Sequence, residues 1–285
     1  MVVVGGVEPP DAPPPEILHR SRVRLWSSLR EVWHSRELVL TLSQRDFLVR
    51  YKQAELGIAW AVVTPLVLVG VFSVVFKRVV NVDTHGAPYV LFSYVGLLPW
   101  TFFSGALSQA SNTLLTNRAL LNRVRLPREV FAVSTVLVAG IDTAISTVIL
   151  GGLFVVYTFM PHATSIWIPA LLAVQILFTM AVALFASVAV VYLRDLRLTI
   201  PIVLQFGLFA TPVAWGLEKV PRGFLPYYSA LNPLGPVIDG YRRTILEGRA
   251  PDVMPFTVAA VSSVVMVLGA YWLFKRLEPG IADVA

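Results

Sequence analysis

The chain contains no cysteine and little charge. Cysteine is absent from all 285 residues, which excludes a disulfide framework, a thiol nucleophile and a zinc–thiolate site. Charged residues make up 14% of the chain and hydrophobic residues 56%, whereas globular proteins carry about 25% charged residues. The mean hydropathy of +0.72 agrees with this balance. The composition therefore indicates an integral membrane protein.

Two common kinds of binding motif are also missing from the sequence. A Walker A loop needs the sequence Gly-Lys-Ser/Thr, because its backbone and its lysine grip the phosphates of a nucleotide. None of the four lysines follows a glycine or precedes a serine or threonine. None of the four histidines has a second histidine three or four residues away, the spacing that a metal site on a helix would need. We therefore expect this chain to bind neither ATP nor a metal by itself.

Six long apolar runs are present instead. A transmembrane helix needs about 20 mostly apolar residues. Since backbone polar groups cannot stay unbonded in lipid, each run is predicted to be a helix, and the fold class to be an all-α membrane protein with six spans within residues 56–285. Internal prolines at Pro65, Pro99, Pro201 and Pro212 predict kinks. The predicted spans are residues 56–76, 87–110, 130–159, 166–193, 198–216 and 256–274.

Basic residues are distributed unevenly between the two sides of these spans. Sixteen of the 23 Lys and Arg residues fall in the N-terminal segment, the second and fourth connections and the C-terminal tail. Because Lys and Arg are enriched in cytoplasmic segments, this bias predicts that both termini are cytoplasmic. The net charge of +6 is thus explained by membrane topology, and we expect no nucleic acid partner.

The segment before the first span has its own pattern. Residues 1–18 are rich in proline and are predicted to be a disordered lead-in, whereas 19–55 are predicted to form cytoplasmic amphipathic helices. A second helix from about Ser35 is indicated by the pairs Leu38/Leu42 and Phe47/Tyr51, four residues apart. The first helix should lie on the membrane surface or, alternatively, pack on a partner domain. Its apolar stripe consists of Leu25, Trp26, Leu29, Val32 and Trp33.

Residues 217–255 are too polar to span the membrane, yet they contain aromatic and apolar clusters between prolines. Two half-helices that dip back into the outer leaflet fit this pattern, because backbone at that depth is tolerated where protein or water covers it. The stretch from Leu234 to Leu246 is predicted to be one short helix. We expect an external re-entrant segment between spans five and six.

Asp142 is a single acidic residue in the third predicted span. An ionised Asp at the centre of a span costs about 2.5–3.5 kcal/mol on insertion scales. A proton relay normally needs several such groups. A polar contact between helices, or a helix face open to water, is the simpler interpretation, with ion coupling as the alternative.

Several motifs resemble one known family. The sequence Arg45-Asp-Phe-Leu-Val-Arg-Tyr-Lys-Gln-Ala-Glu-Leu-Gly57 is similar to the segment that leads into the membrane in the membrane subunits of polysaccharide ABC exporters, the Wzm and TagG type. The resemblance continues from about residue 35 to the end of the chain. Further matching stretches are Gly96-Leu-Leu-Pro-Trp-Thr-Phe-Phe103, Leu126-Pro127-Arg128-Glu129, Asn232-Pro-Leu234 and Asp239-Gly-Tyr-Arg242.

The resemblance implies a homodimer in the bacterial plasma membrane that encloses a polymer channel. It also implies two separate ATPase subunits, which would bind ATP and Mg and would contact the loop 111–129 and the N-terminal helices. The implied cargo is a polyprenyl-diphosphate-linked polysaccharide, such as an O-antigen, a teichoic acid or a galactan-like polymer. This chain would then be a transport subunit and not an enzyme.

Three groups of site residues follow as hypotheses. The first group would couple the chain to the ATPase; alternatively, the basic residues of this loop only set the orientation of the spans. This group contains Asn117, Arg118, Asn122, Arg123, Arg125, Arg128 and Glu129. The second group receives the lipid diphosphate, since Arg offers a bidentate fork, unless it only anchors the chain at the interface; it contains Arg45, Arg50, Tyr51 and Lys52. The third group lines the channel with aromatic faces, unless these face lipid; it contains Phe72, Trp100, Phe103, Phe206 and Phe209.

Two other functions compete with transport driven by a partner. A membrane glycosyltransferase or lipid-modifying enzyme would need acidic or histidine clusters near the interface. The five acids expected outside, Asp83, Glu218, Asp239, Glu247 and Asp252, contain no Asp-x-Asp pair. An ion-coupled transporter would need more intramembrane ionisable residues than the single Asp142.

Overall fold

The computed structural model describes residues 31, 33–52, 59–75, 84, 86–118, 120 and 126–284. The predicted lead-in and the stripe residues Leu25, Trp26, Leu29 and Val32 lie outside this part of the chain. Within it, every regular element is a helix, in agreement with the predicted all-α class.

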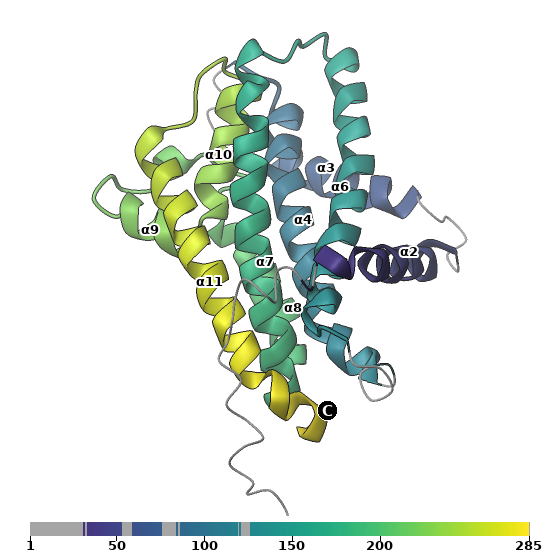
Figure 1. The fold of residues 1–285 in the computed structure, drawn as a ribbon. Coiled ribbons are helices and arrows are strands. Elements are labelled where there is room, and N and C mark those ends of the chain that lie inside the picture. The colour runs from purple at the N-terminus through teal and green to yellow at the C-terminus, as the bar shows by residue number, and fades with distance from the viewer. Residues whose placement is uncertain are drawn as a thin grey trace, which may run out of the picture.

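Four helices are long and apolar enough to cross a membrane. They include α4 (Tyr89–Thr116), α6 (Glu129–Val156), α7 (Ile168–Tyr192, preceded by the short η3, Ala163–Trp167) and α11 (Val253–Val284). Shorter apolar stretches lie in α3 (Ala59–Val75) and α8 (Leu196–Ala210). The long helices run roughly side by side, with α7 packed between α4 and α11, and α2 (Arg36–Lys52) lies across α6 (Figure 1).

Proline positions explain several helix limits. Pro88 has extended backbone directly before α4, and Pro65, Pro99 and Pro201 lie inside α3, α4 and α8. The prediction was wrong for Pro212, which lies beyond α8. Thr211 takes an extended conformation (φ −92°, ψ 142°), because a residue before proline is disfavoured in the helical region. The helix therefore ends at Ala210, before the predicted end of the fifth span at residue 216.

The polar segment after α8 contains three short helices: η4 (Leu217–Lys219), α9 (Leu225–Leu231) and α10 (Leu234–Ile245). The short helix predicted from Leu234 is thus confirmed as α10. It packs against α4 and α7 (Figure 1) and does not project away from the bundle. A buried hydrogen bond from the Tyr241 hydroxyl to Gln175 Oε1 of α7, at 3.0 Å, fixes this position.

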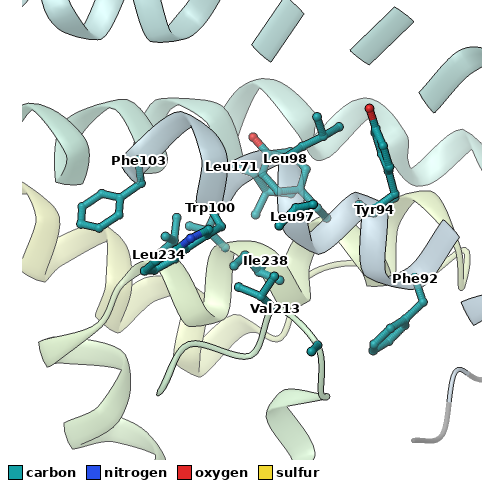
Figure 2. Packing of buried hydrophobic residues seen from close by; sticks show 14 of the residues in the cluster. Phe92, Tyr94, Leu97, Leu98, Trp100, Phe103, Leu171, Val213, Leu234 and Ile238 are labelled. Atoms are coloured by element: carbon teal, nitrogen blue, oxygen red, sulfur yellow. The ribbon is translucent and has the colours of Figure 1, made fainter. Parts of the chain in front are cut away.

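Buried apolar side chains form clusters at both ends of the bundle. Near α10, residues of α4 meet Leu171 of α7, Val213 and the α10 residues Leu234 and Ile238 (Figure 2). Near α2, Leu42 belongs to a cluster that also contains residues of four other helices: Leu114, Phe131, Leu184 and Phe274. The second cluster attaches α2 to the bundle, and the predicted pair Phe47/Tyr51 is confirmed by a ring separation of 4.8 Å.

Candidate transport and coupling sites

Four of the predicted coupling residues are described, and they range from exposed to fully buried. Asn122, Arg123 and Arg125 lie outside the described residues, and Arg118 is exposed. Asn117 is buried at the end of α4, where its Oδ1 accepts a hydrogen bond from Arg45 Nη2 of α2 at 2.8 Å. The end of α4 is therefore held to α2.

Glu129, the first residue of α6, has no solvent-exposed surface. Its carboxylate accepts from Lys275 Nζ at 2.8 and 3.0 Å and from the Tyr271 hydroxyl at 3.1 Å, and both partners belong to α11. Lys275 also contacts Glu278 at 3.0 Å, and Arg128 donates to the backbone carbonyl of Glu278. Any part that Glu129 plays in coupling must therefore act through α11, since its carboxylate does not face the subunit surface.

The basic residues at the end of α2 converge with an acid on α6. Arg50 Nη1 pairs with Asp142 Oδ2, and the Tyr51 hydroxyl donates to Asp142 Oδ1 at 2.9 Å. Lys52 is exposed. The interpretation of Asp142 as a polar contact between helices is confirmed. Of the four residues predicted to receive a diphosphate, Arg50 and Tyr51 already share one anionic partner.

The five candidate channel aromatics separate by burial. Phe72, Trp100 and Phe103 are buried within the subunit, where Phe103 stacks on Phe178 of α7 with ring centroids 5.3 Å apart. Phe206 and Phe209 of α8 are 71% and 55% exposed. No residue of α8 is buried in the subunit. The exposed apolar surface of this helix thus includes Phe206 and Phe209, together with Leu198, Ile202 and Val203.

Arg242 of α10 is a buried cation that the sequence analysis did not single out. It is 1% exposed, and its guanidinium donates to four backbone carbonyls: Phe92 at 3.1 Å, Pro212 at 2.7 Å, Trp215 at 2.9 Å, and Val213. The guanidinium also lies over the Phe92 ring, 3.7 Å from its centroid. Arg242 therefore joins α10, α4 and the turn after α8.

A sequence signal for this burial existed in the spacing. Arg242 falls four residues after Ile238 and three before Ile245, on the apolar stripe of α10. Asp239, three residues earlier on α10, pairs with Arg243 at 3.7 Å.

Known protein families provide a further comparison. The sequence model described as "ABC-2 type transporter" matches residues 37–246, most of the helical bundle. The chain belongs to the ABC-2 type transporter family.

Individual proteins of similar sequence align with more of this ABC-2 type transporter than the family model does. An O-antigen export system permease protein RfbA of Myxococcus xanthus is 29% identical over 90% of this chain and 98% of that protein. A Klebsiella pneumoniae protein of the same name is 23% identical over 87% of this chain and 95% of that protein. The similarity thus covers both the helical bundle and most of the polar segments between its helices.

Proposed function

We propose that this ABC-2 type transporter is the channel-forming membrane subunit of an ATP-driven exporter for a polyprenyl-diphosphate-linked polysaccharide. The observation that carries the proposal is the family match over residues 37–246, together with O-antigen export permeases that align over nearly their whole length. An O-antigen-like glycan is therefore the first cargo to test, before teichoic acids and galactans.

Separate ATPase subunits would supply the energy, one for each of two permease copies. The absence of a Walker A sequence supports a nucleotide site on a partner. Arg118 is exposed at the start of the connection between α4 and α6, which makes it available to such a partner. Behind it, Asn117 and Glu129 attach this connection to α2 and α11.

A homodimer with six spans per subunit would enclose the channel. The shorter apolar helices α3 and α8 would complete the six spans, and the α8 face with Phe206 and Phe209 would turn toward the channel or the second copy. The packing of α10 against α4 and α7 supports its re-entrant position in the outer leaflet. Both termini would lie in the cytoplasm of a bacterium, with the permease in the plasma membrane.

The test reverses charge in the proposed ATPase contact. Arg123→Glu/Arg125→Glu should leave membrane insertion intact and uncouple ATP hydrolysis from export, because an acidic loop no longer complements the surface that it contacts. The measurement compares ATPase activity of the co-purified complex with the amount of glycan on the cell surface. Arg249→Glu, an exposed charge reversal in the external segment, is the matched control.

Two results would contradict this proposal in different ways. Normal export by the double variant would remove the loop from the coupling contact. If cells depleted of the permease did not accumulate a lipid-linked glycan inside the membrane, the polysaccharide cargo itself would be wrong.

A further inference from the structure

Arg50 and Tyr51, at the end of α2, both donate to the carboxylate of Asp142. The guanidinium and the phenol each take one carboxylate oxygen, Oδ2 and Oδ1 respectively. The Arg50 side chain is 35% exposed and that of Asp142 21% exposed. The two donors therefore form a small oxyanion site at the surface of the subunit, and a residue of the same chain fills it.

This contact is not needed to attach α2 to the bundle. Val39 and Leu42 are buried against the neighbouring helices, Ser43 of α2 contacts the backbone carbonyl of Ser134 at 3.4 Å, and Arg45 binds Asn117. All these contacts precede Arg50 along α2. The Arg50–Tyr51 end is thus a separate contact, and its opening would leave these other contacts of α2 in place.

We propose that Asp142 occupies an anion site which the diphosphate of the cargo takes over. The inference rests on the proposed function, because a lipid-linked diphosphate is the ligand which that function brings to α2. A diphosphate carries more negative charge and more acceptor oxygens than one carboxylate, and a guanidinium fork suits it. The exposed Lys52, one residue further, adds a cation that Asp142 does not engage in this structure.

Because Asp142 competes for the same donors, a ligand must displace it in order to bind. If a ligand binds only sites from which Asp142 is displaced, its apparent affinity is its intrinsic affinity multiplied by the fraction of such open sites. This factor is the same for every ligand. A phospholipid with a single negative charge offers less charge and fewer acceptor oxygens than a diphosphate, so the same factor would keep its occupancy of the site low. A diphosphate binds strongly enough to remain. Asp142 thereby sets the affinity that a ligand needs in order to occupy the site, without contacting the cargo.

The test uses the permease–ATPase complex in phosphatidylcholine nanodiscs, with farnesyl diphosphate as the probe. Asp142→Asn should tighten binding about tenfold, the ratio expected when one charge-assisted hydrogen bond stops competing. Phosphatidylglycerol should gain by a similar factor. Arg50→Gln should weaken binding of farnesyl diphosphate, and adding Asp142→Asn to it should bring no gain. Glu37→Gln, which removes an exposed acid near the start of α2, is the control and should change binding less than twofold.

The outcomes separate this inference from the proposed function. If Arg50→Gln weakens binding while Asp142→Asn leaves it equal or weaker, Asp142 only positions Arg50 and the inference is overturned. If Arg50→Gln has no effect, the cargo entrance on α2 is itself wrong. Inorganic pyrophosphate as a second probe shows whether the diphosphate alone suffices or the lipid is required.

A measurement on the unchanged chain covers the case in which Asp142→Asn does not fold. A water-soluble carbodiimide labels free carboxylates, so labelling of Asp142 should rise when farnesyl diphosphate displaces it from Arg50. Phosphatidylcholine without the probe sets the baseline. Unchanged or reduced labelling at saturating probe would overturn the displacement.

Discussion

Replacement of Gly96 by alanine should destabilise the subunit, because Gly96 leaves room for the buried guanidinium of Arg242. A Cβ at Gly96 would lie 2.4 Å from Arg242 Nη2 and 3.0 Å from both Arg242 Cζ and the carbonyl oxygen of Val213. A contact of 2.4 Å cannot persist, so either the guanidinium or α4 must move. Four carbonyls hold the guanidinium from α4 and from the turn after α8.

The size of the effect follows from what the guanidinium would lose. Withdrawal from Gly96 breaks at least the hydrogen bond to Val213, and a hydrogen bond to a charged group contributes about 1.5–3 kcal/mol. Residual overpacking adds about 1–3 kcal/mol. A total of about 2.5–6 kcal/mol corresponds to a fall in melting temperature of roughly 4–10 °C for a chain of 285 residues.

The assay is thermal unfolding of the purified protein in detergent, followed by size-exclusion chromatography. Gly105→Ala is the matched control on the same helix, since nothing lies within 4 Å of a Cβ there. It should be neutral or slightly stabilising, because alanine favours a helix over glycine. In an Arg242→Met background, Gly96→Ala should cost much less, as the two residues are in contact. Equal melting temperatures for Gly96→Ala and Gly105→Ala would refute the reasoning.

Two further predictions concern the ion pair and the aromatic residues. Lys275→Met should destabilise the protein by about 3–5 kcal/mol in thermal unfolding, because it leaves the carboxylate of Glu129 buried without its cation. The double variant Lys275→Met/Glu129→Gln should recover most of the lost stability. An unchanged melting temperature for Lys275→Met alone would contradict the role of the pair. A cysteine substituted for Phe206 or Phe209 should react with water-soluble thiol reagents faster than a cysteine substituted for Trp100. Bound cargo should slow the reaction at Phe206 and Phe209. Faster labelling at Trp100 would contradict a channel face on α8.

The sequence predicted the helical class and most helix positions, because apolar runs and prolines act locally. It also predicted α2 from two i,i+4 pairs. Burial of single side chains depends on partners far along the chain and is therefore much harder to predict. Glu129 meets Lys275 across 146 residues, and Arg242 meets the carbonyl of Phe92 across 150. The apolar stripe of α10 could have indicated that Arg242 is buried, but no local pattern reveals the partners of either residue.

The candidate channel aromatics show again that local sequence does not predict which side chains are buried. Phe72, Trp100 and Phe103 carry the same local signal as Phe206 and Phe209, namely an aromatic residue in an apolar run with a proline. Only the packing of the helices separates them. Trp100 lies against Gly207 of α8, where an added Cβ would come within 2.9 Å of its ring, so its face is already covered inside the subunit. Composition alone cannot distinguish a covered aromatic face from an open one.

Helix α6 physically connects the proposed coupling region with the proposed anion site. Glu129 at its first residue is tied to α11, and Asp142 is tied to the end of α2. The two residues are 13 positions apart, about 20 Å along unbroken helix. Coupling between distant sites requires a packed element that both sites can bias. Under the proposed function, an ATPase that displaces the start of α6 must also shift Asp142 relative to Arg50 or carry α2 along. The first of these motions changes how firmly Asp142 fills the anion site. ATP hydrolysis and cargo binding would therefore act on the same helix, and each would affect the other through the Arg50–Asp142 contact.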